Sequence, residues 1–204
     1  MNKNDEQILV VDREKLFNHE QNVFQGFLSK EKFTKIELDD IQVKRRGDME
    51  LNPAYKQLIT YAIVQDKETN NVLLYKRLSG SGEKRLVNKT SIGVGGHANM
   101  HKSDTFDDLM FANFHRELNE ELNIDGQIRV ELLGFLNDDG NEVGKVHLGV
   151  VYLVQVNSAK KVTVNEQDTL EIEFVPVEEL EKDEKLESWS ELLMKSTELK
   201  SKLK

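Results

Sequence analysis

The run HRELNEELNI, residues 115–124, is the part of the sequence best suited to chemistry. If it is helical, each residue advances by about 100°, and Glu117, Glu120 and Glu121 fall within an arc of about 100°. Like charges at these spacings repel one another, so a divalent cation that neutralises them would explain the cluster. The alternative is an acidic face exposed to water, which is the commoner explanation of a glutamate-rich turn taken alone.

Two segments upstream supply further groups that a ligand would need. The glycine-rich IGVGG, residues 92–96, lets backbone N–H and C=O groups approach a ligand closely. Before it, segment 75–89 contains one glutamate and five basic residues: Lys76, Arg77, Lys84, Arg85 and Lys89. Basic residues, a glycine loop and a carboxylate cluster in this order are what a metal-bound polyphosphate would require.

Residue alternation and turn residues predict a sheet that would position these groups. Strands are predicted at 7–11, 57–64, 71–78, 129–137, 145–156 and 169–177. The second and third are separated by a polar turn and predict a hairpin. The fourth and fifth predict another hairpin, because Asp139 and Gly140 between them are a strong turn pair.

The charged run belongs to a helix predicted from near Asp104 to about Leu122. Asp104 and Asp107 are spaced like an N-cap residue and its partner, and Asn123 stands where a left-handed C-cap residue is expected. The predicted core-facing stripe consists of Phe111, Phe114, Leu118 and Leu122. The three glutamates would border this stripe on one flank.

A further amphipathic helix is predicted at 188–204. Ser188 and Glu191 have the spacing of a capping box at its start. Trp189 is expected to anchor this helix to the body of the protein. The helix would pack on the main domain.

Composition excludes several classes of site. The 204 residues include no cysteine, so a metal would be held by oxygen or imidazole, and oxygen ligands favour Mg or Mn. The net charge of -9 argues against general binding to nucleic acid or to an anionic membrane. No uncharged stretch approaches the roughly 20 residues of a membrane span, so a cytoplasmic location is expected.

The helix run resembles the signature of the Nudix hydrolases, G-x5-E-x7-R-E-U-x-E-E-x-G-U, where U is aliphatic. The C-terminal half is matched at every position but Asn123, by Arg116, Glu117, Leu118, Glu120, Glu121 and Ile124. If Gly96 is the motif glycine, the interval to Arg116 is six residues longer than the standard spacing, and Asp108 takes the early glutamate position. The GGH at 95–97 is similar to a subset that includes predicted phosphoesterases and isopentenyl diphosphate isomerases, but those isomerases need a catalytic cysteine.

This resemblance implies an α/β fold, the Nudix-type α/β/α sandwich with a mixed β-sheet and a loop-helix-loop catalytic motif. The implied domain spans 53–187, followed by the helix at 188–204. Residues 1–52 form an N-terminal extension, which could add a strand, cover the site or build a homodimer. The resemblance covers roughly residues 55–187.

Residue roles are carried over from the same resemblance. Glu117, Glu120 and Glu121 would hold Mg2+ or Mn2+ together with the backbone carbonyl of Gly96, and Arg116 would orient a glutamate. Glu117 or Glu120 could act as the base, or Glu166 from a later loop. Substrate phosphates would be contacted by residues of the basic segment and the glycine loop, namely Lys76, Arg77, Arg85 and His97.

The implied activity is MutT-like hydrolysis of a diphosphate bond. The substrate would be a nucleoside diphosphate linked to another group, or a related small organic diphosphate. The alternative is a Nudix-fold module that binds a nucleotide or regulates without the reaction. A nucleic-acid processing enzyme is disfavoured by the acidic net charge, and no motif names the substrate.

Overall fold

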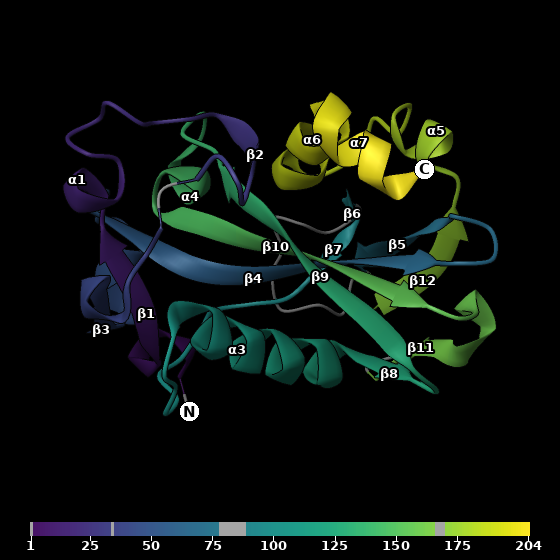
Figure 1. Cartoon of the computed structure of the whole chain (residues 1–204), viewed down its shortest axis with the longest axis horizontal. Coiled ribbons are helices and arrows are strands. Elements are labelled where there is room, and N and C mark those ends of the chain that lie inside the picture. Colours follow the sequence, from purple (N-terminus) through teal and green to yellow (C-terminus); the bar gives the residue numbers. More distant parts are fainter. Residues whose placement is uncertain (1, 34, 78–88, 166–169) are drawn as a thin grey trace.

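A mixed sheet of ten strands forms the centre of the molecule within residues 2–33, 35–77, 89–165 and 170–204, the part of the chain that this computed structural model describes (Figure 1). Its main path, in spatial order, is β12 (Leu170–Val175), β5 (Val72–Arg77), β4 (Tyr55–Asp66), β10 (His147–Val156), β9 (Ile128–Asn137) and β2 (Gly26–Ser29). Strands β4 and β10 are parallel, and the other neighbours on this path are antiparallel. Five of the six predicted strands lie on this path with both predicted hairpin pairings, and the sixth, predicted at 7–11, is β1 (Gln7–Asp12), which pairs with β4.

The remaining strands extend this sheet or stand beside it. They are β1 (Gln7–Asp12), β3 (Ile41–Arg45), β6 (Thr90–Ser91), β7 (Gly93–Val94) and the separate pair β8 (Leu122–Ile124) and β11 (Val162–Val164). Strand β1 pairs with both β3 and β4, and β2 pairs with β9. The N-terminal segment is thus hydrogen-bonded into the central sheet.

Helices cover both faces of the sheet. Helix α3 (Phe106–Glu121) lies on one face, and α5 (Val177–Leu180), α6 (Ser188–Lys195) and α7 (Thr197–Leu203) lie on the other (Figure 1). The short helices are α1 (Arg13–Leu16), α2 (Arg46–Met49), α4 (Glu142–Lys145), η1 (Lys3–Asp5), η2 (Leu38–Asp40) and η4 (Ala159–Lys161). No helix in the described ranges is long and apolar enough to cross a membrane.

Strand alternation divides the apolar side chains between two cores. In β5, Leu73 and Tyr75 belong to the core that includes the α3 residue Phe114. Their neighbours Val72 and Leu74 belong to the core on the other face, with the α6 and α7 side chains. Successive strand residues point to opposite faces of the sheet, so alternate residues of one strand pack against different helix layers.

Helix α3 begins at a different cap from the predicted one. Its N-cap is Thr105, whose hydroxyl oxygen accepts the backbone N–H of Asp108 at 3.1 Å, while the Asp108 carboxylate accepts the Thr105 hydroxyl at 2.7 Å. The prediction of Asp104 and Asp107 was wrong by one residue. Both pairs have the i, i+3 spacing of a cap, so spacing alone did not separate them.

The C-terminal end of α3 also differs from the prediction. Leu122 is extended, with φ -123° and ψ 144°, and Asn123 continues into β8 rather than adopting a left-handed cap. The free carbonyls at this end are capped by a distant residue. Asn165 donates its side-chain amide to the carbonyls of Asn119 at 2.8 Å and Glu120 at 3.2 Å, and its backbone N–H to that of Glu121 at 3.0 Å.

The predicted single helix at 188–204 is two helices, α6 and α7. The N-cap of α6 is Glu187 rather than Ser188, and the chain is extended at Ser196, whose hydroxyl caps α7 by accepting the N–H of Leu199. The break lets both helices bury apolar side chains on the sheet. Trp189 packs against Tyr61 of β4 with ring centroids 5.7 Å apart, as an anchor of this region.

A buried lysine connects the start of β4 to the β9–β10 connection. The ammonium of Lys56, which is fully buried, lies 2.8 Å from Asp139 and 2.9 Å from the carbonyl of Gly144. Arg13 also contacts Asp139, at 2.8 Å. Desolvation alone would raise the pKa of Asp139, but hydrogen bonds from Arg13 and Lys56 hold it well below its usual range.

We expect Asp139→Asn to lower the free energy of unfolding by about 3 kcal/mol, because Lys56 would remain buried without its counter-ion. Urea unfolding followed by circular dichroism measures this change. A depressed carboxyl pKa stabilises the fold above the unfolded pKa and loses that contribution as pH falls through the folded pKa. The wild-type stability should therefore decline below about pH 4, with a shallower decline in the variant.

Glu142→Gln is the matched control, because the Glu142 side chain is exposed and its ion pair is with the half-exposed Lys145. Its effect should stay within about 0.5 kcal/mol. A loss of similar size in both variants would show that Asp139 is no more than a surface charge.

Candidate active site

Glu117 lies at the centre of the buried face of α3. The face contains Phe106, Leu109, Met110, Asn113, Phe114, Glu117 and Leu118. At about 100° per residue, this set centres near Glu117 and Met110, and Asn113 lies about 40° from Glu117. The prediction that Glu117 borders the stripe on its flank was wrong, and so was the placement of Phe111, which is 43% exposed and stacks on Phe114.

The carboxylate of Glu117 packs directly against the glycine loop. A Cβ atom at Gly96 would lie 2.5 Å from the Glu117 Oε2 atom, so any larger residue here would displace this carboxylate. The carbonyl of Gly96 accepts the backbone N–H of Thr60 in β4 at 2.9 Å, which fixes the loop to the sheet. Glu117 is 9% exposed, and this burial raises the pKa of its carboxyl group.

Arg116 is the charge partner of the two glutamates that it precedes. Its NH1 atom lies 2.7 Å from the Glu117 carboxylate and 3.2 Å from that of Glu120. Its NH2 atom donates to the carbonyl of His97 at 2.8 Å. The guanidinium thus joins the α3 carboxylates to the residue that follows Gly96.

Glu120 and Glu121 lie on opposite flanks of Glu117, within the same arc of about 100°. Glu121 lines a small recess with Gly95, Tyr75 and Ile172, beside the junction of α3 with β8. Glu120 is exposed and Glu121 is intermediate in exposure. The three glutamates therefore form a graded series on one turn, from a buried carboxylate to a solvated one.

The donor set suits a hard divalent cation, although the carboxylates are not gathered in this arrangement. Among the described residues, no three histidine, aspartate or glutamate side chains are grouped so as to hold a metal ion. The reason is visible at Arg116, which engages both Glu117 and Glu120. Carboxylate and carbonyl oxygens are nevertheless the ligands that Mg2+ and Mn2+ prefer, and the Glu117 carboxylate packs against the glycine loop at Gly96.

The structure describes only some of the residues that were predicted to contact substrate phosphates. Lys76 follows Tyr75 in β5, so alternation directs it to the face covered by α5–α7, away from α3. This position does not fit the predicted contact. The side chain of Arg77 and all of Arg85 and Glu166 lie outside the described residues.

His97 is enclosed rather than presented to a ligand. Its ring is 9% exposed, with Nε2 at 2.9 Å from the Gln57 side-chain oxygen and at 3.3 Å from Nε2 of His147. Burial lowers the pKa of His97 to about 2, so the ring is neutral. This geometry favours a packing role, in which the ring fixes the loop and its carbonyl receives Arg116.

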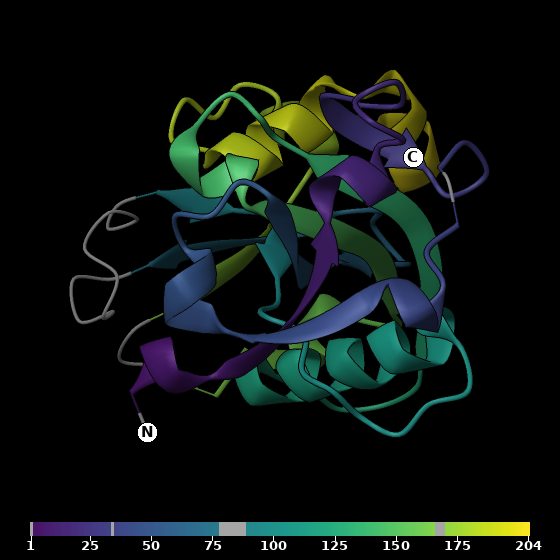
Figure 2. The same ribbon diagram turned by 90° about the vertical axis from the view of Figure 1, so that its left-hand side faces the viewer.

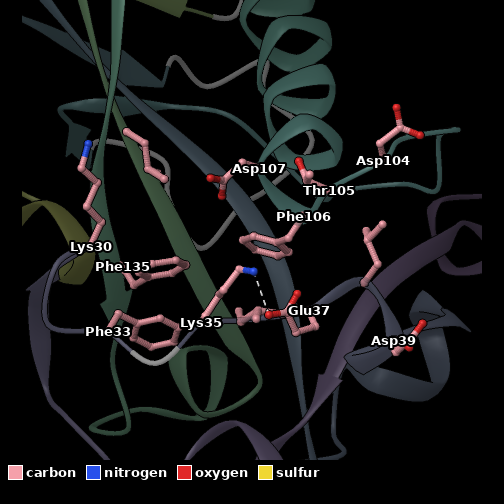
Figure 3. Close-up of a pocket in the computed structure, with 13 residues that line it drawn as sticks. Lys30, Phe33, Lys35, Glu37, Asp39, Asp104, Thr105, Phe106, Asp107 and Phe135 are labelled. Carbon is pink, nitrogen blue, oxygen red and sulfur yellow. Dashed lines mark ion pairs between the residues drawn. The ribbon is translucent and has the colours of Figure 1, made fainter.

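A larger hollow of about 620 Å3 lies at the opposite end of α3 (Figure 3). The stacked rings of Phe33 and Phe135, 3.9 Å apart, line it together with Phe106 and Asp107. Phe106 and Glu120 are 14 residues apart on the helix, which corresponds to roughly 21 Å. The hollow is therefore separate from the carboxylate cluster.

Comparison with known proteins identifies this arrangement. A model of the NUDIX domain matches residues 56–196. The chain belongs to the Nudix family. Protein YmaB of Bacillus subtilis (strain 168) is 38% identical over 204 residues, with 95% of this chain and 98% of that protein covered.

Solved structures agree with this Nudix assignment. Tm1382, described as a candidate Nudix hydrolase, superimposes with a TM-score of 0.72 and 30% identity over 93% of this chain and 96% of its own. DR0079 from Deinococcus radiodurans shares the fold, with a TM-score of 0.52 and 14% identity over 83% of this chain and 96% of that one. The chain is a Nudix-type hydrolase, of a family that cleaves diphosphate bonds and generally uses divalent metals.

Three residues that hold this Nudix site were not singled out in the sequence. Thr60 fixes Gly96, Asn165 caps the C-terminal end of α3, and Asn113 lies on its buried face. Asn113 left a signal, because it is a polar residue at a position where the helical pattern calls for an apolar one. Thr60 and Asn165 left none, since their partners are far away in sequence.

We expect Gly96→Ala to reduce the rate of diphosphate hydrolysis by about 10²-fold, because the added methyl group would displace the Glu117 carboxylate. Initial rates on a diphosphate compound that the wild-type protein hydrolyses measure the loss. Gly140→Ala is the matched control, since its Cβ would meet a side-chain oxygen of Asp138 at 3.1 Å, far from α3. Equal rates in wild type and Gly96→Ala would contradict the importance of this contact.

Proposed function

We propose that the protein is a Mg2+- or Mn2+-dependent hydrolase that cleaves the diphosphate bond of a nucleoside diphosphate linked to another group, or of a related small organic diphosphate. The observation that carries this proposal is the contact of the buried Glu117 carboxylate with Gly96, with Glu120 and Glu121 on the same turn. This contact brings the Glu117 carboxylate to the glycine loop, and the other two proposed carboxylate ligands follow at the same end of α3. The acidic net charge and the absence of a nucleic-acid motif favour a small-molecule substrate.

Glu117, Glu120 and Glu121 are the proposed metal ligands, together with the carbonyl of Gly96. That carbonyl oxygen accepts the Thr60 backbone N–H at 2.9 Å and the Thr60 hydroxyl at 3.5 Å, so the hydroxyl would turn away to leave a lone pair for the metal. A bound Mg2+ or Mn2+ would lower the pKa of a water ligand and offset charge on the phosphate oxygens. The Glu120 carboxylate must turn from Arg116 to join this set, and its exposure leaves it free to do so.

Proton transfer is assigned to Glu117 or Glu120. A general base works best when its pKa lies near the working pH, and burial moves the pKa of Glu117 upward in that direction. Arg116 acts in the opposite direction, because its positive charge, 2.7 Å from the same carboxylate, lowers the pKa of Glu117. Glu166 is a further candidate base from the loop after β11.

Substrate phosphates are assigned to Arg77 and Arg85. Both belong to the basic segment 75–89, which begins in β5 with Tyr75, a residue that lines the recess beside Glu121. Guanidinium groups bind phosphate oxygens in a bidentate geometry, which suits this role. Lys76 is left out of the proposed set because of its position on the other face of the sheet.

We expect Glu120→Gln to abolish turnover while leaving the fold intact, because the exposed side chain contributes a charge to the site and little to the core. The wild type should release phosphate or a monophosphate from a panel of dinucleotides, nucleotide sugars and nucleoside triphosphates with Mg2+ or Mn2+. Thermal unfolding of both proteins checks the fold.

Glu178→Gln, at an exposed glutamate of α5, is the matched control and should keep wild-type rates. Normal hydrolysis by Glu120→Gln would refute the metal assignment. If calorimetry shows tight binding of a panel compound and no product forms, the chain is a binding module and the proposed activity is wrong.

A further inference from the structure

Asn113 makes an unusual set of hydrogen bonds for a residue in the middle of a helix. It is fully buried on the sheet-facing side of α3, one turn before Glu117. Its side-chain oxygen accepts the backbone N–H of Asn99 at 2.7 Å, and its amide donates to the Asn99 carbonyl at 2.9 Å. It also donates to the carbonyl of Leu109 at 2.9 Å.

The two bonds to Asn99 hold the backbone of the loop between Gly96 and α3. One amide side chain pairs with both the N–H and the C=O of a single loop residue, as a neighbouring strand would. We call this pairing the Asn99–Asn113 clamp. A longer loop loses more conformational entropy when it is ordered, and this loop exceeds the standard motif spacing by six residues. The clamp provides the fixed point that the added length requires.

The clamp also reaches the N-terminal segment, which lies outside the matched Nudix range. The Asn99 amide donates to the carbonyl of Gln7 at 2.8 Å and to the carboxylate of Glu6 at 3.1 Å. Beside it, the N–H of Leu9 donates to the carbonyl of Ala98 at 2.8 Å. Figure 2, in which the N-terminal strands face the viewer, shows β1 on the same side of the molecule as the loop that enters α3.

At its other end, the clamp meets the guanidinium that holds the glutamates. The NH2 atom of Arg116 lies 3.4 Å from the Asn113 side-chain oxygen and 2.8 Å from the His97 carbonyl. Arg116 Nε is buried and has no hydrogen-bond partner among the described residues. The orientation of the guanidinium therefore depends on these two acceptors and on the carboxylates of Glu117 and Glu120.

We propose that Asn113 is a positioning residue for the hydrolysis, through which the N-terminal segment sets the metal affinity of the carboxylate cluster. This inference rests on the proposed function, since it assumes that Glu117 and Glu120 bind the metal. Loss of the clamp frees the long loop and removes an acceptor from Arg116. The guanidinium then competes with the metal for the carboxylates in an altered geometry.

The test measures Mn2+ binding to the full-length protein without substrate, by electron paramagnetic resonance of free Mn2+. Asn113→Ala should raise the Mn2+ dissociation constant by about tenfold, the lower end of the losses seen when partners of metal ligands are removed. Turnover should fall at limiting Mn2+ and return for the most part at saturating Mn2+. A role confined to stability would lower the melting temperature and leave the dissociation constant unchanged.

The proposed path runs from the N-terminal segment through Asn99 and Asn113 to Arg116. Asn99→Ala tests its first part, because it removes the contacts with Glu6 and Gln7 but keeps the backbone bonds to Asn113. It should weaken Mn2+ binding by several-fold. The double variant should bind no more weakly than Asn113→Ala alone, since residues in one path have non-additive effects. Additive losses would overturn the path from the N-terminal segment.

Asn137→Ala is the matched control for truncation of a buried asparagine. Asn137 is also fully buried and donates to a loop carbonyl, that of Phe24 at 2.6 Å, but it lies on β9. The Asn137→Ala variant should be less stable than the wild type and should keep the wild-type affinity for Mn2+. If the wild type binds Mn2+ and Asn113→Ala binds it equally well, the inference fails and the proposed function stands. If the wild type neither binds Mn2+ nor hydrolyses any substrate, both fail.

Discussion

The burial of the Glu117 carboxylate is the constraint on which the rest of the site depends. Removing a carboxylate from water costs several kcal/mol unless a partner compensates, and Arg116 at 2.7 Å supplies that partner. The carboxylate packs closely against Gly96, and an added side chain there would displace it. Gly96 and Arg116 both contact this carboxylate, so the three residues form one unit. The high cost of a lone buried charge explains why their geometry is so closely specified.

The surrounding elements make this unit rigid. Thr60 fixes the glycine loop to β4, Thr105 and Asp108 cap one end of α3, and Asn165 caps the other. The site is therefore held at both ends of its helix and at its loop. Side chains on such fixed elements keep their relative positions better than side chains on loops alone. Glu120 is the most exposed of the three glutamates, and Glu121 is intermediate in exposure.

The N-terminal residues contribute to the same unit although the NUDIX model begins at residue 56. Strand β1 pairs with β4, and the backbone N–H of Leu9 donates to the carbonyl of Ala98 in the loop before α3. The buried pair of Lys56 and Asp139 adds a second connection to this end of the sheet, through Arg13. The segment is consequently a structural support of the long loop.

The sequence by itself predicted six of the strands, helix α3 and its three glutamates, because these depend on local alternation, helical periodicity and a short motif. Tertiary structure decided what local rules leave open. Competing caps at Asp104 and Thr105 have the same spacing, and the end of α3 is set by Asn165, 44 residues after Glu121 in the chain. The burial of Glu117 and Asn113 follows from the rotation of α3 on the sheet, which depends on contacts between distant residues.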